Sequence, residues 1–294
     1  MFNNLAKVVE ALQNEGFSTL TTEGSFDIVA KRDDRLLLIK VLTNVDGLSQ
    51  EQAMSLRAIS HFLSAHPFVI SVKNNREQLD DNVVYSRFDI PVVTPALFSS
   101  ILNEKTLPFS SAKGRHTIEV DSGLMKETRN GAGMTLEELA DKVGVSKKAI
   151  YEIENQRVNP SEETVKKLES ALSIKLKKPY EMKTAPMTHL KPKTDFQSKV
   201  SREFSRIGID NSSVYSAPFE IVGKEKFSII TRLSYTVDKG TSVVKKLSGM
   251  FSSKAVVIAK KAGKNADGLA VVLESELPEI GSSKELKKLI EEKD

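Results

Sequence analysis

The chain has 294 residues, 39% of them hydrophobic and 28% charged, which is enough apolar material for about two or three folded domains. It contains no cysteine, which excludes disulfides, thiolate nucleophiles and cysteine-ligated zinc sites. Its four histidines are scattered, so we expect no metal and no cofactor. The net charge of +4 is compatible with a nucleic-acid partner, but a charge this small does not indicate one by itself.

The beginning of the sequence does not have the pattern of a targeting segment. Glu10 and Glu15 interrupt it, and apolar and polar positions alternate, unlike the apolar centre of a signal peptide. No stretch approaches the ~18 apolar residues that a membrane-spanning helix needs. We therefore expect a cytoplasmic protein that makes no membrane contact.

Helical and strand patterns alternate over residues 1–111. Apolar positions from Phe2 to Leu12 recur at helical spacing, and Gly16 ends that helix. Further along, short apolar runs predict strands and longer periodic runs predict helices, in the order strand 26–30, strand 35–42, helix 50–63, strand 68–72, strand 90–94 and a helix reaching Ile101. This alternation predicts an α/β domain.

Residues 118–176 differ from this pattern and are expected to be almost entirely helical. Residues 177–195 hold three prolines and several lysines without an apolar period, which predicts a basic linker. The sequence leaves open whether these lysines are only solvated or contact phosphate groups.

The pattern of the first domain recurs in residues 196–294. The segment 219–238 aligns with 26–46 when one residue is deleted. The surrounding patterns follow the same order, with matches at 200–209, 254–263 and 269–280. We interpret this as a duplicated α/β domain on the far side of the helical region.

The most informative segment is 134–174. Thr135 and Glu138 have the spacing of a capping box, which predicts a helix start. Gly144 stands where that helix ends, because a positive φ costs glycine nothing there, and Ser146 can cap the next helix. The expected inward-facing positions are Leu139, Ala140, Val143, Ile150 and Ile153. The segment therefore predicts two short helices that cross closely at a turn.

This pattern resembles the Cro/lambda-repressor type of helix-turn-helix domain from Gly123 to Ile174. The resemblance implies a five-helix domain whose second motif helix enters the DNA major groove. It also implies a homodimer on a two-fold site, since one such helix spans few base pairs. One position departs from the family, because Leu136 stands where members often carry a glutamine that contacts DNA.

The resemblance also implies which residues face DNA, namely Thr135, Ser146, Lys147, Lys148, Tyr151, Glu152, Asn155 and Arg157. Lys147 or Lys148 would donate to guanine O6 and N7. Tyr151 would pack on a thymine methyl group or bond a phosphate.

The remaining predicted contacts are less direct. Glu152 either accepts from cytosine N4 or pairs with Lys148 four residues earlier, and we favour the ion pair. Asn155 and Arg157 lie just beyond the helix and would hold the phosphate backbone, which sets register without reading sequence.

The first predicted hairpin resembles the PD-(D/E)XK nuclease fold, in particular archaeal Holliday-junction resolvases. Those enzymes carry an Asp and then a Glu-X-Lys, in which the carboxylates hold divalent metal and the lysine assists the attacking water. Here Asp27 matches the Asp, but Lys40 and Leu42 stand at the Glu and Lys positions. In the repeat, Glu220 and Arg232 fall on Asp27 and Lys40. A cation beside the remaining acid repels metal, so we expect both copies to be catalytically inactive.

The complete arrangement places two related restriction-endonuclease-like domains on either side of a five-helix lambda-repressor-like domain. This arrangement is similar to a family of archaeal HTH-type transcriptional regulators. We therefore expect a DNA-binding transcription regulator rather than an enzyme, with double-stranded DNA as its partner. A structure-specific nuclease or junction-binding protein remains the alternative, and a protein-binding scaffold is a third. It also remains open whether the α/β domains dimerise, pair with each other, bind DNA or bind an effector.

Overall fold

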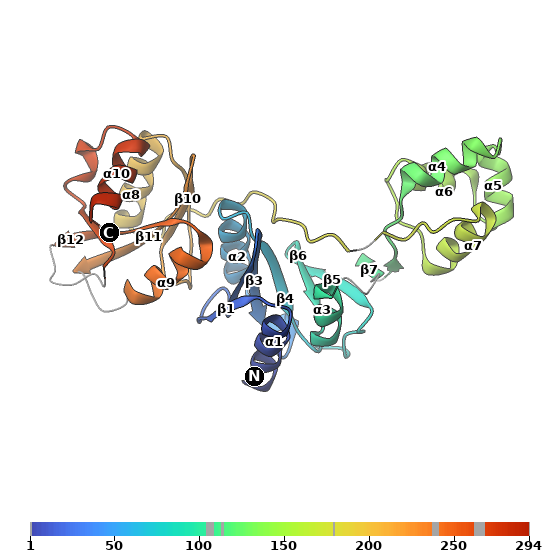
Figure 1. Ribbon diagram of the computed structural model, residues 1–294, viewed down its shortest axis with the longest axis horizontal. Helices are drawn as coiled ribbons and strands as arrows, with labels where there is room; N and C mark the ends of the chain where they lie inside the picture. The colour runs from blue at the N-terminus through green and yellow to red at the C-terminus, as the bar shows by residue number, and fades with distance from the viewer. Residues whose placement is uncertain are drawn as a thin grey trace.

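The computed structural model describes residues 2–103, 109–112, 115–178, 180–236, 241–261 and 268–293. The chain folds into an N-terminal unit up to Thr117, a helical domain at 118–178 and a C-terminal unit from Asp195. Figure 1 shows the two sheet-containing units side by side and the helical domain apart from them. In the described residues, every helix is too short or too polar to span a bilayer.

The N-terminal unit is a sheet between helices. Its strands lie in the order β1-β2-β3-β4-β6-β5-β7-β8. Along the chain its elements are α1 (Phe2–Asn14), β1 (Ser18–Thr21), β2 (Ile28–Arg32), β3 (Arg35–Val41), α2 (Gln50–Phe62), β4 (His66–Ile70), β5 (Val83–Arg87), β6 (Ile90–Val93), α3 (Pro95–Leu102), β7 (Phe109–Ala112) and β8 (Arg115–Thr117). Helices α1 and α3 pack on one face, and α2 on the other.

The C-terminal unit repeats this plan with five strands in the order β13-β12-β11-β10-β9. Its elements are α8 (Asp195–Arg206), β9 (Asp210–Ser213), β10 (Ile221–Lys224), β11 (Ser228–Thr236), α9 (Thr241–Phe251), β12 (Lys254–Lys261), β13 (Ala270–Leu273) and α10 (Ser283–Lys293). The strand directions match those of β1-β2-β3-β4-β6, antiparallel twice and then parallel twice. The two units therefore share one topology.

The hydrogen-bond register of the two units agrees residue by residue. Asp27 N donates to Ile39 O over 2.8 Å, and Glu220 N donates to Thr231 O over 3.0 Å. This register superposes Lys40 on Arg232, as in the sequence alignment. Five strands, β1, β5, β7, β8 and β9, were not expected from the sequence, because runs of three to five residues are too short to show a clear alternation.

The two units are held together by a single apolar layer between their sheets. Leu56, Ile59 and Phe62 of α2 belong to the same buried cluster as Leu247 and Phe251 of α9. Helix α2 packs against β10, and α9 packs in return against β2. The duplicated units thus pair within one chain around an approximate two-fold axis.

Polar contacts across this axis are reciprocal. Lys31 Nζ donates to Ser252 Oγ over 2.5 Å, and the equivalent Lys224 Nζ donates to Ser64 Oγ over 2.9 Å. Ser25 crosses the axis as well, since its Oγ donates to Tyr215 O over 2.6 Å.

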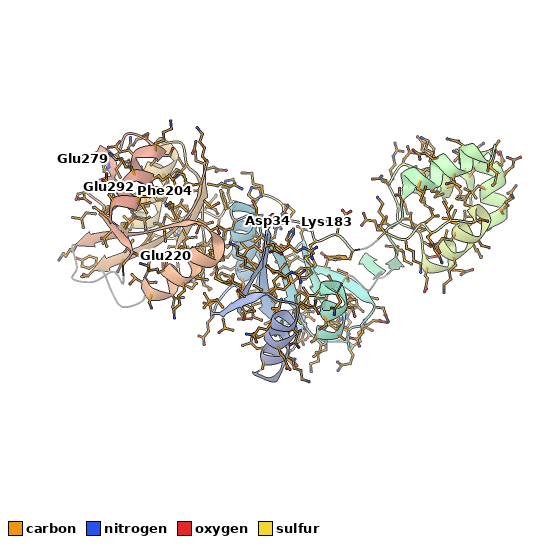
Figure 2. All side chains as sticks on the ribbon, in the orientation of Figure 1. Asp34, Lys183, Phe204, Glu220, Glu279 and Glu292 are labelled. Atoms are coloured by element: carbon orange, nitrogen blue, oxygen red, sulfur yellow. The ribbon has the colours of Figure 1, made fainter. Side chains whose placement is uncertain are left out.

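The segment from 180 to 194 has no helix or strand, yet it is not a free linker. Tyr180 and Met182 pack on the core of the N-terminal unit, with the Tyr180 and Phe68 ring centroids 6.3 Å apart. Burial raises the pKa of Tyr180. Leu190 is buried in the layer between the units. Lys183 on this segment is labelled in Figure 2 and lies between the N-terminal unit and the helical domain.

The helical domain consists of α4 (Ser122–Gly131), α5 (Leu136–Val143), α6 (Lys147–Glu154) and α7 (Glu162–Leu172). The prediction of a fifth helix in this domain is wrong, because residues 118–178 contain four α-helices. Ser173 turns into the left-handed region at φ 57°, and the chain then runs extended, with Val120 and Lys177 forming an antiparallel bridge.

Gly24 offers a test of the paired arrangement. Its φ is +126°, and a Cβ there would lie 1.9 Å from Ser216 O of the other unit. We expect Gly24→Ala to lower the free energy of unfolding by ~2–5 kcal/mol, from backbone strain plus overpacking. Denaturant titration of the full chain measures this. Gly249→Ala on α9, where a Cβ meets nothing within 4 Å, is the matched control and should be neutral or stabilising. Equal effects of both changes would contradict the described contact.

Candidate nucleic-acid interface

Helix α5 and helix α6 are each started by a side-chain cap. Thr135 Oγ1 accepts from Glu138 N, and Glu138 accepts in return from Thr135 N over 2.7 Å. The backbone hydrogen bond from Thr135 lowers the pKa of Glu138. Gly144 ends α5 in the left-handed region at φ 75°, and Ser146 Oγ then accepts from Ala149 N at the start of α6. Thr135 and Ser146 therefore use their side chains within the protein.

The inner faces of α5 and α6 meet in the core of the helical domain. The five positions expected to face inward are all buried, at Leu139, Ala140, Val143, Ile150 and Ile153. Leu136, where relatives of the predicted type often have glutamine, is half-buried and packs against the same core. At this position the side chain serves packing.

A buried ion pair locks α6 to α4. Arg129 Nε and Glu154 Oε1 are 2.6 Å apart, and Arg129 Nη2 donates to Glu154 Oε2 over 3.0 Å. The hydrogen bonds to Glu154 raise the pKa of Arg129. Arg129 also donates to Met134 O, and Ser122 Oγ donates to Ile153 O over 2.6 Å. Sequence reasoning missed this pair, although a charged residue directly after the inward Ile153 was a usable signal.

The outer face of α6 is open to solvent. Lys147 and Lys148 are exposed, and Tyr151 is 43% exposed. The Lys147 ammonium group lies 3.2 Å from Glu137 Oε2 in an exposed ion pair, which restrains it little. The Arg157 guanidinium group stacks over the Tyr151 ring, 5.5 Å from its centroid. This face thus presents three cations and one aromatic ring.

Two side chains at the end of α6 have partners other than those expected. Glu152 pairs with Arg157 at 3.5 Å rather than with Lys148. The reason is that the turn after α6 brings Arg157 back, with Arg157 N donating to Glu152 O. Asn155 Nδ2 donates to Tyr151 O over 2.7 Å and so caps the helix end. Asn155 would have to give up this bond to contact a phosphate.

A groove of about 650 Å³ runs beside α6 towards the start of α7. Lys148 and Glu152 line it from α6, and Ser161 and Thr164 line it from α7. Since Ser161 is the N-cap of α7, the positive ends of two helix dipoles point towards this side of the domain.

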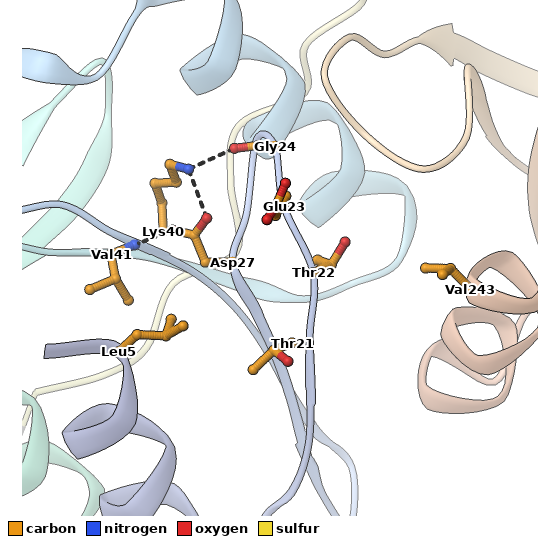
Figure 3. Close-up of a pocket in the computed structure, with 9 residues that line it drawn as sticks. All are labelled: Leu5, Thr21, Thr22, Glu23, Gly24, Asp27, Lys40, Val41 and Val243. Atoms are coloured by element: carbon orange, nitrogen blue, oxygen red, sulfur yellow. Dashed lines mark hydrogen bonds and ion pairs between the residues drawn. The ribbon is translucent and has the colours of Figure 1, made fainter. Parts of the chain in front are cut away.

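The nuclease-like positions of the N-terminal unit lie far from this face in the fold. Asp27 and Lys40 form a buried ion pair, with Asp27 Oδ1 and Lys40 Nζ 2.8 Å apart, as Figure 3 shows. Lys40 Nζ also donates to Gly24 O over 2.7 Å, and Val41 N donates to Asp27 Oδ2 over 2.7 Å. Leu42, at the former lysine position, is half-buried against the apolar layer between the units.

The C-terminal unit shows the same arrangement. Leu233 N donates to Glu220 Oε2 over 2.6 Å, which matches the bond from Val41 to Asp27. Arg232 donates to Pro218 O over 3.1 Å, much as Lys40 donates to Gly24 O. In both units the side chain of a cation donates a hydrogen bond to a main-chain carbonyl group in the loop that precedes the acid.

A divalent metal does not fit either position. Metal sites of the PD-(D/E)XK type need a second carboxylate where Lys40 and Arg232 stand. The ammonium group of Lys40 lies 2.8 Å from Asp27 Oδ1, and its charge opposes a second cation there. Among the described residues, no cluster of three or more acids or histidines could hold a metal ion.

Comparisons with known proteins agree with both structural features. Residues 2–108 match the model of a PD-(D/E)XK superfamily domain, and residues 125–178 match a helix-turn-helix model. Over its whole length the chain is similar to archaeal proteins named as proposed HTH-type transcriptional regulatory proteins. One from Methanothermobacter thermautotrophicus is 32% identical, over 98% of this chain and 96% of the relative. One from Pyrococcus horikoshii is 29% identical, over 99% of this chain and 93% of the relative.

The Arg129–Glu154 pair gives a prediction for the helical domain. Arg129→Met leaves Glu154 buried without its partner, so we expect the opening free energy of α4–α7 amides to fall by ~3–5 kcal/mol. Native-state hydrogen exchange on the full chain measures it. Lys126→Met on the exposed face of α4 is the control and should change little. Adding Glu154→Leu to Arg129→Met should recover part of the lost opening free energy, because it removes the unpaired charge. If the double variant recovers none of it, the loss does not come from the buried charge of Glu154.

Proposed function

The chain belongs to this family of archaeal HTH-type transcriptional regulatory proteins, and from that premise we propose that it regulates transcription by binding DNA through α6. The observation that carries the proposal is the exposed face of α6, where Lys147, Lys148 and Tyr151 project from a helix that is fixed on its other side. A helix held this firmly can enter the major groove without losing its own order.

The roles of the outer residues follow from their freedom and position. Lys148 makes no ion pair among the described residues and lies near the start of α6, so we assign it a base contact. Arg157 lies beyond the helix over the Tyr151 ring, so we assign it a phosphate contact. Thr135 and Ser146 act as caps that orient backbone N–H groups towards the DNA.

We propose that two chains bind a two-fold operator. Each chain carries one helical domain, although it carries two nuclease-like units. The pairing of the two units within one chain supplies no second copy of α6. That copy must therefore come from a second chain. The protein would act in the cytoplasm, where it meets double-stranded DNA.

We further propose that residues 1–111 and 196–294 are both degenerate nuclease-like domains without enzymatic activity. The shared strand order and the cations Lys40 and Arg232 support this for both units. The PD-(D/E)XK match itself favours the competing function, a structure-specific nuclease, and cleavage therefore has to be tested directly.

The base contact is tested with DNA fragments selected from the host genome by the purified protein. We expect Lys148→Ala to weaken binding at a selected site by ~1–3 kcal/mol and to leave non-specific binding nearly unchanged. The matched control is Lys166→Ala, an exposed lysine of α7 that pairs with Glu162. Arg157→Ala should weaken all sequences alike and reduce the salt slope by about 1. If the protein has no salt-sensitive affinity for DNA, the regulator assignment is wrong and a protein-binding scaffold is favoured.

The enzyme alternative is tested by incubating duplex and four-way-junction DNA with the protein and Mg²⁺ or Mn²⁺. We expect no cleavage, because Lys40 blocks the metal position. Cleavage that disappears in Asp27→Ala would overturn this prediction. Cleavage that survives Asp27→Ala is assayed again with Glu220→Ala added: its loss in the double variant would also overturn the prediction, and its persistence would point to a contaminating nuclease.

A further inference from the structure

Glu152 places a carboxylate on the outer face of α6, among the cations of that face. The other acid of α6, Glu154, is buried behind the helix against Arg129. Glu152 follows Lys148 by one helical turn and lines the same groove. A carboxylate at this position works against phosphate binding, because it repels phosphate groups and cancels part of the positive charge nearby.

The structure holds Arg157 beside this carboxylate. The Arg157 guanidinium group lies 3.5 Å from Glu152 Oε1 and 5.5 Å from the centroid of the Tyr151 ring. The main chain enforces the approach, since Gln156 has a left-handed φ of 57° and Arg157 N donates to Glu152 O over 2.9 Å. Arg157 is therefore turned back towards α6 by the backbone as well as by its own side chain.

The two partners differ in how free they are. The side chain of Glu152 is 23% exposed and lies against the groove, whereas that of Arg157 is 58% exposed. When the pair separates, Arg157 can move out to a phosphate, and Glu152 stays on the face of α6. Its carboxylate then needs another hydrogen-bond donor.

DNA sequences differ in whether they supply that donor. In the major groove, cytosine and adenine present an exocyclic amino group, whereas guanine and thymine present acceptors to the same edge. A base pair that offers its amino group to Glu152 replaces the lost partner, and one that does not leaves the carboxylate unpaired. An exposed ion pair of this kind changes affinity by roughly fivefold at most.

We propose that Glu152 is a specificity-determining residue, which restrains Arg157 and so weakens binding to DNA that offers no amino group to its carboxylate. It raises specificity by lowering the affinity for wrong sequences, because specificity is a difference between two affinities. This inference rests on the proposed function, since it requires α6 to bind DNA. The restraint of Arg157 by Glu152 can be measured without DNA.

The main test is Glu152→Gln, which removes the charge and keeps the shape of the side chain. We expect it to bind non-specific duplex up to about fivefold more tightly and to steepen the salt slope by about 1, the opposite of Arg157→Ala. At sites selected by the unaltered protein we expect no gain. The ratio of specific to non-specific affinity should therefore fall by the same factor.

Two further variants separate this role from a general effect of charge. Glu127→Gln removes the same charge from the exposed side of α4 and should change both affinities little and equally. Glu152→Gln combined with Arg157→Ala should bind non-specific duplex as Arg157→Ala does alone, because the effect passes through Arg157. The proposal is overturned if Glu152→Gln has no larger effect than Glu127→Gln, if its gain is equal on selected and non-specific DNA, or if the gain persists without Arg157.

The restraint itself is measured by NMR of the Arg157 Nε–Hε group in the full chain without DNA, with Arg157→Ala used to assign the signal. Glu152→Gln should make this group more mobile, with a lower heteronuclear NOE, and Glu127→Gln should leave it unchanged. An unchanged signal in Glu152→Gln would overturn the inference whatever the DNA results are. If the signal changes as expected but the protein shows no salt-sensitive affinity for DNA, the regulator assignment fails, and the role of Glu152 in specificity fails with it.

Discussion

The apolar layer between α2 and α9 is the contact on which the rest of the molecule depends. It buries the inner faces of two sheets that would otherwise be exposed, and burial of large apolar side chains such as Phe62 and Phe251 is the main source of folding free energy. The layer makes one body of two similar units, and the segment at 180–194 passes across both. Leu190 of that segment is buried in the layer, which fixes the approach to the C-terminal unit.

This pairing also explains what became of the nuclease-like positions. The loops that precede Asp27 and Glu220 meet near the two-fold axis, where Ser25 bonds to Tyr215 O and Ser216 O. Lys40 and Arg232 bond to carbonyl groups of these same loops. Each of these cations thus supports the loop that contacts the other unit. The same position in both repeats therefore holds a cation that fixes a loop at the contact between the units.

The helical domain is built differently, because its helix α6 is fixed on one face and exposed on the other. The apolar stripe of α6 and the Arg129–Glu154 pair hold the helix from behind, while Lys148 and Tyr151 remain accessible in front. Residues 118–178 hold four α-helices, where the family resemblance implied five, and α6 keeps its exposed face in this smaller domain.

The sequence alone determined the features that depend on neighbours within about four residues. The caps at Thr135 and Ser146, the left-handed Gly144 and the periodic core positions all follow from local backbone chemistry, and the aligned segments reveal the repeat. Only the tertiary structure decided which distant groups meet. Arg129 and Glu154 are 25 residues apart in the chain, and Ser25 and Tyr215 are 190 apart. Glu152 forms its ion pair with Arg157 rather than with Lys148, because the turn after α6 folds the chain back towards it. No local pattern encodes such pairs, since their energy depends on how whole layers pack.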